Sequence, residues 1–195
     1  MTRLYDRVAL IGLGLIASSM AHAMKANGLA GEIVGHAQSE ATRAAALRIG
    51  FCDRVEETAA AAVAGADLVV LAGPGGALGA IAEAIGPHLA PGACVTDVGS
   101  VKRAVIDVVS PHIPRGVSFV PGHPLAGTEH SGPYSGFATL FVNRWCLLTP
   151  CAESSPEAVA PPAVAAGGRA ANPGRPGPPP MAPGSRLAKK SMPSR

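Results

Sequence analysis

The sequence predicts a doubly wound α/β fold, in which a mostly parallel sheet carries helices on both faces. Short, uninterrupted apolar runs recur along the first 150 residues, and such runs are typical of strands that are buried on both faces. Alanine-rich stretches that end at glycine or proline separate the runs, and they are typical of helices. The regular alternation of the two patterns indicates a parallel sheet with crossover helices.

Each predicted element follows from a local signal. Strands are predicted at residues 8–11, 32–35, 67–71, 93–96, 117–120 and 145–148. Helices are predicted at residues 15–27, 40–49, 76–85 and 101–109. Gly28 and Gly50 stand where the first two helices would end, and Ser39 stands where the second would be capped.

The composition limits the class of protein. Hydrophobic residues make up 48% of the chain and aromatic residues only 4%, so small aliphatic side chains must build the core. The first 150 residues carry ten Lys and Arg against eleven Asp and Glu, so the net charge of +3 comes from the last 45 residues. A nearly neutral folded part lacks the basic surface that nucleic-acid binding requires.

The cysteine pattern and the N-terminal residues indicate the cellular compartment of the protein. The chain has four cysteines, Cys52, Cys94, Cys146 and Cys151. Their spacing fits no metal site, and a chain of this size needs no disulfides, which favours reduced thiols in a cytoplasm. The apolar run at 8–16 imitates a secretory signal, but its two glycines and the preceding Asp6 argue against that alternative. No segment reaches the roughly 18 apolar residues of a membrane span.

The last 45 residues differ in character from the rest. They hold ten of the nineteen prolines and no aromatic residue or histidine. Such a segment buries too little apolar surface to offset the entropy lost on ordering. We therefore expect a folded domain at 1–150 and a Pro-, Gly-, Ala- and Arg-rich tail at 151–195 that is disordered.

A glycine-rich turn follows the first predicted strand and begins the first predicted helix. It reads Gly12, Leu13, Gly14, Leu15, Ile16 and Ala17. Gly12 permits a tight turn, Gly14 lets a pyrophosphate approach the backbone, and Ala17 allows close packing of helix on strand. The helix N-terminus, at Leu15 and Ile16, offers free N–H groups to the phosphates. The motif predicts a Rossmann-like site for NAD or NADP, although such turns also serve packing alone.

The end of the second predicted strand leaves the choice of cofactor open. An acidic residue there would bind the 2′-hydroxyl of the adenosine ribose in NAD. This chain has His36 at that point, and Ser39 and Arg43 follow close enough to meet the 2′-phosphate of NADP. A plain surface role for His36 is an equally good interpretation.

Two further motifs lie at the carboxyl ends of predicted strands. The first runs from Asp97 through Gly99 and Ser100 to Lys102, and the second runs from residue 121 to residue 132 and contains His123. In open α/β sheets the ligand crevice lies beyond the carboxyl ends of the strands, so both motifs point toward the cofactor. Taken singly, Asp97 could instead cap a helix, and Lys102 and His123 could be ordinary surface or loop residues.

Together with the glycine-rich turn, these motifs resemble the prephenate/arogenate dehydrogenase family of tyrosine biosynthesis. The likeness covers roughly residues 6 to 150. It implies oxidative decarboxylation, with hydride transfer from the substrate ring to NAD(P) and no metal. It also implies that His123 accepts the proton of the ring hydroxyl, that Ser100 assists at that hydroxyl, and that Thr128 and Glu129 shape the substrate pocket. Asp97 is expected on the cofactor side.

The residue chemistry agrees with this role for His123. Loss of a hydride from a carbinol carbon needs a base for the hydroxyl proton. The unperturbed pKa of histidine, about 6.5, leaves a neutral imidazole for that task at physiological pH.

The resemblance also implies a second, all-helical domain through which the family dimerises and which supplies an arginine for the substrate. The sequence after residue 160 shows no such pattern, and a change of reading frame there is one hypothesis. We then expect dinucleotide binding with little or no turnover. The alternatives left open are a non-catalytic dinucleotide-binding remnant and a related dehydrogenase of hydroxy acids.

Overall fold

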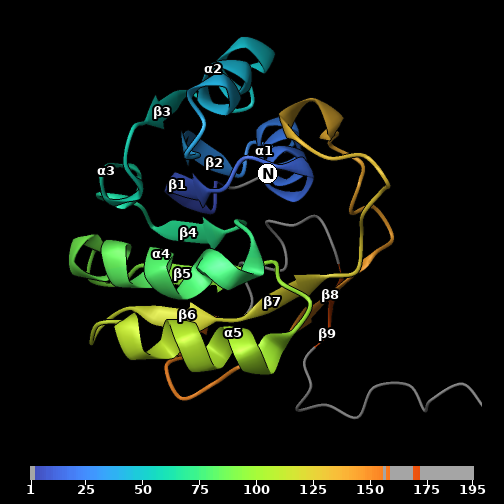
Figure 1. The fold of residues 1–195 in the computed structure, drawn as a ribbon. Helices are drawn as coiled ribbons and strands as arrows, with labels where there is room; N and C mark the ends of the chain where they lie inside the picture. Colours follow the sequence, from blue (N-terminus) through green and yellow to red (C-terminus); the bar gives the residue numbers. More distant parts are fainter. Residues whose placement is uncertain (1–2, 156, 159–168, 172–195) are drawn as a thin grey trace, which may run out of the picture.

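A six-stranded parallel sheet forms the centre of the molecule. The computed structural model describes residues 3–155, 157–158 and 169–171. The strand order is β3-β2-β1-β4-β5-β6, and every neighbouring pair is parallel. Figure 1 shows these strands stacked in that order, with helices packed along them. This is the order of doubly wound dinucleotide-binding sheets, and the predicted fold class is confirmed.

The strands of the main sheet and the helices around it lie close to their predicted positions, with one strand and one helix added. The strands of the sheet are β1 Tyr5–Ile11, β2 Ala30–His36, β3 Arg54–Glu56, β4 Leu68–Leu71, β5 Cys94–Asp97 and β6 Ser118–Val120. The α-helices are α1 Leu15–Ala26, α2 Glu40–Ile49, α3 Ala59–Val63, α4 Leu78–Ile85 and α5 Lys102–Val109. Short 3₁₀ turns are η1 Gly75–Ala77, η2 Gly86–His88, η3 Ser110–His112 and η4 Pro133–Ser135. β3 and α3 were not predicted, because both are too short to show a periodic pattern.

A second, small sheet adjoins the first. It contains β7 Gly122–Pro124, β8 Trp145–Leu148 and β9 Arg169–Ala171, with β7 and β8 antiparallel. In Figure 1 β7 follows directly on β6 and then meets β8. The predicted strand at 145–148 is therefore real, but it pairs outside the main sheet.

The main sheet separates two apolar cores. Along β1, Val8 and Leu10 belong to one core while Ala9 and Ile11 belong to the other, because alternate side chains point to opposite faces. Helices α1 and α2 contribute to the first core, and α3, α4 and α5 contribute to the second. Tyr5, Phe51, Phe119 and Phe141 are the aromatic residues among the buried hydrophobic side chains of the described chain, and nearly all the others are aliphatic, as the composition predicts.

Helix ends in α2 follow the predicted capping chemistry. The side chain of Ser39 accepts a hydrogen bond from the N–H of Thr42. Gly50 ends the helix with a φ of 85°, a conformation that costs glycine little and other residues more.

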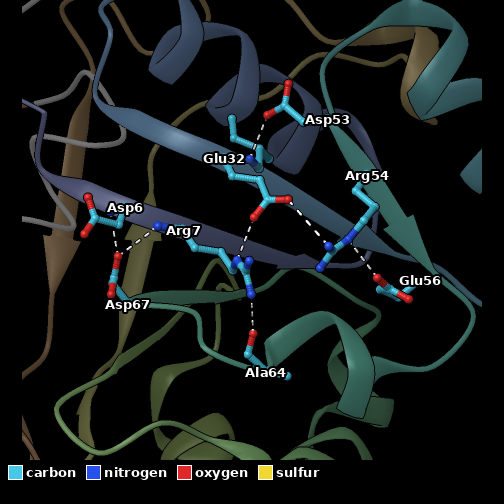
Figure 2. Close-up of polar contacts among 9 residues, drawn as sticks. Asp6, Arg7, Glu32, Asp53, Arg54, Glu56, Ala64 and Asp67 are labelled. Atoms are coloured by element: carbon cyan, nitrogen blue, oxygen red, sulfur yellow. Dashed lines mark hydrogen bonds and ion pairs between the residues drawn. The ribbon is translucent and has the colours of Figure 1, made fainter.

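The amino-terminal edge of the sheet is closed by a polar network, shown in Figure 2. The Arg7 guanidinium donates to the Glu32 carboxylate at 2.6 Å and to the carbonyl of Ala64 at 2.9 Å. The Asp67 carboxylate accepts from the N–H groups of Asp6 and Arg7 at 2.6 and 2.8 Å. These bonds join β1, β2, β4 and the end of α3 at one edge.

The network continues to the outermost strand. Arg54 on β3 pairs with Glu56 at 2.8 Å and lies 3.7 Å from Glu32. These side chains keep about a third or more of their surface exposed, so each pair adds little stability by itself. Their effect is to satisfy the polar groups at this edge of the sheet.

The segment after residue 150 is partly described. The carbonyl of Glu153 accepts from the N–H of Phe119 at 3.0 Å, and the hydroxyl of Ser154 donates to the carbonyl of Phe119 at 2.5 Å. Residues 151–155 therefore run along β6, and residues 169–171 pair with β8. The rest of the predicted tail, and the proposed change of frame near residue 160, lie outside the described residues.

Strand β2 packs so closely at Gly35 that a side chain does not fit. A Cβ added there would lie 2.6 Å from the Cys52 sulfur and 3.0 Å from a methyl group of Leu13. Burial raises the pKa of Cys52 to about 12, so this thiol is protonated and acts as a packing group.

We expect Gly35→Ala to destabilise the domain by about 1–3 kcal/mol, because the new methyl group overpacks the core. The double variant Gly35→Ala/Cys52→Ala removes the sulfur that the methyl group would meet. It is expected to be more stable than the sum of the two single variants predicts. Urea denaturation of all four proteins measures the coupling, and strict additivity of the two changes would contradict the close contact.

Candidate active site

The loops that follow β1, β2, β4, β5 and β6 gather at the carboxyl edge of the sheet. The N–H of Gly12 donates to the carbonyl of His36 at 2.8 Å, and the N–H of Ala72 donates to the carbonyl of Ile11 at 2.7 Å. The N–H of Val98 donates in turn to the carbonyl of Leu71 at 3.3 Å. The predicted glycine-rich turn and both downstream motifs therefore lie on one edge.

The two glycines of the turn meet different demands. Gly12 has a φ of +98°, and a Cβ there would lie 2.6 Å from the backbone of Ala72. Gly14 has an extended backbone, with a φ of −87°, and a Cβ there would meet nothing within 4 Å. Gly12 is therefore required by the fold itself, whereas the space beside Gly14 is left open.

The N-terminus of α1 faces this open space with unused donors. Gly14 is the N-cap and provides no side-chain cap, and the first-turn residues include no acid. The first helical bond runs from Ser18 N–H to the carbonyl of Gly14, at 2.9 Å. Among the described residues, the N–H groups of Leu15, Ile16 and Ala17 have no protein acceptor. A twelve-residue helix with free N–H groups favours an anion such as a pyrophosphate.

The end of β2 lies beside the turn and contains the predicted adenosine-side residues. His36 is half-buried, with its Nδ1 3.0 Å from the carbonyl of Glu56 on β3. Ser39 caps α2 through its side chain. The Arg43 guanidinium donates to the carbonyls of Ala37 and Gln38 at 2.6 and 3.0 Å, which holds it over this loop.

The Asp97 carboxylate joins the two downstream motifs. Its Oδ2 accepts from the N–H of Gly99 at 2.7 Å and from the Lys102 ammonium, and its Oδ1 accepts from the N–H of Gly122 at 3.2 Å. Lys102 also donates to the carbonyl of Gly122 at 2.5 Å. Both backbone groups of Gly122 are thus bound by one ion pair.

Burial dominates the electrostatics of this pair. The Asp97 side chain is fully buried and that of Lys102 is 14% exposed. Loss of hydration raises the pKa of Asp97, against the opposing effect of Lys102 and two backbone donors. Loss of hydration also lowers the pKa of Lys102, against the attraction of Asp97. With its carboxylate engaged internally, Asp97 could contact a cofactor only through its main chain.

Ser100 and His123 each follow a residue that the Asp97 carboxylate holds. Ser100 comes after Gly99 and is exposed in an open groove of about 550 Å³ between the η1–α4 and α5 segments. His123 comes after Gly122 and is half-buried on β7, where it lies opposite Leu147 of β8. Within the described part of the chain, neither side chain has a hydrogen-bond partner.

The small sheet that contains His123 has one solvent-exposed face, called here the open face, and one buried face. The side chains of Trp145 and Leu147 are 45% and 40% exposed, whereas Cys146 and Leu148 are buried. Burial raises the pKa of Cys146, which is a protonated thiol beneath the sheet. His123 shares the open face with Leu147, because directly opposed residues of two antiparallel strands point the same way.

The predicted substrate residues lie on an exposed loop after β7. Both Thr128 and Glu129 are exposed, and the Thr128 hydroxyl accepts from the N–H of His130 at 3.2 Å. The same loop then crosses α1, where a Cβ on Gly136 would lie 2.0 Å from the Ser18 hydroxyl. Within the described residues, no hydrogen bond or ion pair joins Thr128 or Glu129 to His123, so their assignment stays a prediction.

Two important residues were not identified from the sequence. Lys102 could not be told from a solvated helix residue, and Gly122 was read only as part of a motif. The five-residue separation of Asp97 and Lys102 was the available signal, since it places the lysine at the first position of a helix that begins beside the carboxylate.

Membrane and metal signals are also absent from the described residues. They include no helix that is both long and apolar enough to cross a bilayer. They also include no group of three or more His, Cys, Asp or Glu side chains arranged to hold a metal ion.

We expect Lys102→Met to destabilise the domain by about 3–5 kcal/mol at pH 7, because it leaves a buried carboxylate without a partner. The pKa of Asp97, already raised, would rise further, so the folded state would bind a proton more tightly than the unfolded state. The loss should therefore be fully present above this raised pKa and should shrink as the pH falls through it. Urea denaturation between pH 7 and pH 5 measures this change.

Two controls accompany this measurement. Asp97→Asn/Lys102→Met removes both charges and keeps an acceptor for the backbone donors, so it should be more stable than Lys102→Met at pH 7. Arg103→Met changes the adjacent, 88% exposed residue and should have little effect. A Lys102→Met protein with unchanged stability would show that the pair does not hold these loops.

Comparisons with known proteins agree with the geometry. Residues 20–163 match the family model for the nucleotide-binding domain of prephenate dehydrogenase. The cyclohexadienyl dehydrogenase of Zymomonas mobilis is 40% identical over 156 residues, which are 80% of this chain and 53% of that protein. The prephenate dehydrogenase of Bacillus subtilis is 34% identical over 160 residues, which are 82% of this chain and 43% of that protein. The chain thus spans about half the length of these curated relatives.

Solved structures of the same class have the same fold. The arogenate dehydrogenase of Synechocystis superposes with a TM-score of 0.77 at 29% identity, over 85% of this chain and 58% of that one. The prephenate dehydrogenase of Aquifex aeolicus, in complex with hydroxyphenyl propionate and NAD+, gives 0.74 at 25% identity, over 85% and 59%. The resemblance that the three motifs indicate is confirmed, and the chain belongs to the family of prephenate dehydrogenase nucleotide-binding domains.

Proposed function

We propose that this chain binds NAD or NADP at the carboxyl edge of its sheet and serves the oxidative decarboxylation of prephenate or arogenate. The observation that carries the proposal is the Asp97 carboxylate, which holds the residues before Ser100 and His123 together. A dinucleotide-binding turn with a free helix N-terminus lies on the same edge. In this proposal the glycine-rich turn and the N-terminus of α1 bind the cofactor, and the loop that contains His123 provides the base.

The names of the relatives support one chemical class of substrate. The proteins that match are named prephenate, arogenate or cyclohexadienyl dehydrogenases, and one of them was solved with NAD+. All these names describe oxidation of a cyclohexadiene ring that carries a hydroxyl group.

The proposed cofactor site runs along three loops. The pyrophosphate would bind the free N–H groups of Leu15, Ile16 and Ala17, with Gly14 leaving room for it. The adenosine end would lie near His36 at the end of β2, and the nicotinamide end near Ser100. When bound, the nicotinamide supplies the hydride acceptor of the reaction.

The proposed chemistry at the protein is a proton transfer. The imidazole of His123 would take the proton of the ring hydroxyl as the hydride leaves, which stabilises the developing carbonyl. The hydroxyl of Ser100 would donate to or accept from the same oxygen. Both side chains lack protein partners in the described residues, so both are available to a substrate. Departure of carbon dioxide then makes the ring aromatic, which drives the reaction forward.

The remaining residues have supporting roles in the proposal. Asp97 and Lys102 position the two catalytic loops, and Thr128 and Glu129 contribute to the substrate pocket from the loop after β7. The binding domain is proposed to comprise residues 1–150. A reducing, cytoplasmic location suits the four free cysteines, none of which pairs with another.

A pair of glycine variants tests cofactor binding. Gly14→Ala is expected to keep the stability of the domain, because its Cβ meets no protein atom within 4 Å. It should weaken binding of NAD and NADP by at least about tenfold, the equivalent of one lost charge-assisted hydrogen bond. Isothermal titration calorimetry measures the binding and thermal denaturation the stability.

Gly12→Ala is the matched control for this experiment. It forces a φ of +98° on alanine and a contact of 2.6 Å with the Ala72 backbone, so it should lower the stability of the domain. If Gly14→Ala binds both dinucleotides as tightly as the parent chain, the proposed pyrophosphate site is wrong.

A histidine variant tests the chemistry. His123→Asn is expected to lower the turnover of prephenate or arogenate by about 10²–10⁴-fold, the usual contribution of a positioned base. Dinucleotide affinity should stay unchanged, because the proposal assigns His123 to the substrate and not to the cofactor. Nicotinamide absorbance follows turnover, with His88→Asn, on the distant η2 turn, as the control. Full activity in His123→Asn would exclude this residue as the base. If neither the parent chain nor any variant turns over the substrate, a role in dinucleotide binding alone is favoured.

A further inference from the structure

We propose that this chain prefers NADP to NAD and that Arg43 binds the 2′-phosphate of the adenosine ribose. The inference rests on the proposed dinucleotide site and adds the identity of its cofactor. Three features of the loop between β2 and α2 carry it: a missing carboxylate, a fixed guanidinium and unused backbone donors.

The residue that usually selects NAD is absent. In dinucleotide-binding sheets that prefer NAD, a carboxylate at the end of the second strand accepts hydrogen bonds from the ribose hydroxyls and repels a 2′-phosphate. Here β2 ends at His36, whose carbonyl accepts from Gly12 in the glycine-rich turn. The position is therefore the expected one, and its side chain carries no negative charge.

The His36 ring is oriented by its neighbour on β3. Its Nδ1 lies 3.0 Å from the carbonyl of Glu56, and a carbonyl can only accept, so Nδ1 holds the proton. The second ring nitrogen, Nε2, is left for a ligand. It accepts when the ring is neutral and donates when the ring is protonated, which suits a ribose hydroxyl or a phosphate.

Arg43 is held in place with donors to spare. One terminal nitrogen donates to the carbonyls of Ala37 and Gln38 at 2.6 and 3.0 Å. Within the described residues, its Nε and other terminal nitrogen have no acceptor, and no carboxylate forms an ion pair with it. A guanidinium fixed in this way loses little entropy on binding a phosphate, and it matches two phosphate oxygens at once.

The first turn of α2 adds further donors. Ser39 satisfies the N–H of Thr42 through its hydroxyl, and its carbonyl accepts from the N–H of Arg43. The N–H groups of Glu40 and Ala41 have no acceptor among the described residues. A ten-residue helix therefore directs free N–H groups toward the same loop as the guanidinium.

The acids around this loop do not replace the missing carboxylate. Glu56, at the end of β3, is engaged by Arg54 at 2.8 Å. Glu40 and Glu57 line a groove of about 370 Å³ together with Arg43 itself, but within the described residues neither carboxylate forms an ion pair with the guanidinium. The Aquifex aeolicus relative was solved with NAD+, so the preference would belong to these residues and not to the fold.

Calorimetric titration of the full chain with NAD+ and NADP+ tests the preference directly. We expect NADP+ to bind at least about tenfold more tightly, the effect of one or more charge-assisted hydrogen bonds. The fragments 2′,5′-ADP and 5′-AMP should show the same order, because the difference lies in the 2′-phosphate. Binding of NADP+ should also weaken more steeply with added salt than binding of NAD+.

Three variants of the loop and one control assign the effect to residues. Arg43→Ala should lower NADP+ affinity about tenfold and leave NAD+ affinity unchanged. Arg43→Gln removes the charge but keeps an N–H₂ donor for the loop carbonyls, so it should act the same way if the loop stays folded. His36→Asp should weaken NADP+ and strengthen NAD+ without touching the bonds of Arg43. Arg48→Ala, in the last turn of the same helix, should change neither affinity.

The outcomes separate this inference from the proposed function. Equal or tighter binding of NAD+, or an equal loss of both affinities in Arg43→Gln, would overturn the NADP preference while leaving dinucleotide binding intact. Failure of the folded chain to bind either dinucleotide would overturn the proposed function itself. Tighter binding of NADP+ that disappears in Arg43→Gln, with Arg48→Ala unchanged, supports the inference.

Discussion

The carboxyl edge of this domain depends on one buried ion pair. The carboxylate of Asp97 accepts from the N–H groups of Gly99 and Gly122 and from the Lys102 ammonium. Lys102 also donates to the carbonyl of Gly122. Burial opposes both charges, so the pair is not a simple source of stability. The pair fixes the positions of the residues that it binds, because separating the two charges would leave each of them buried without a partner. The loops after β5 and β6 are thereby fixed relative to each other.

The backbone packs so closely around the ion pair that position 122 has no room for a side chain. A Cβ on Gly122 would lie 2.9 Å from the Asp97 carbonyl and 3.1 Å from the Thr96 hydroxyl, which itself donates to the carbonyl of Val120. Glycine at 122 lets the chain leave β6, pass against β5 and begin β7 within two residues. That sharp passage is what delivers His123 to the open face of the small sheet.

The sequence indicated the parallel sheet, the glycine-rich turn and the capping of α2 by Ser39, because each depends on local signals. It did not indicate that 145–148 pairs with 122–124, since the partner of a strand lies far away in the chain and both segments are apolar. Nor did it separate the buried Lys102 from a solvated lysine, because burial depends on the strands that surround it. Asp97 was expected on the cofactor side, yet its carboxylate is turned inward to the loops.

The two edges of the sheet differ in how their polar groups are satisfied, and this difference explains where a ligand can bind. At the amino edge, Asp67 accepts from the backbone of β1, and Arg7 on β1 donates to Glu32 on β2 and to the carbonyl at the end of α3. At the carboxyl edge, the first three N–H groups of α1 and the first two of α2 are left without protein acceptors in the described residues. Free donors at two helix N-termini attract anions, and the ion pair of Asp97 and Lys102 uses its charge internally and does not compete for them. A phosphate-bearing ligand is therefore favoured at the carboxyl edge by the donors that the fold leaves unpaired.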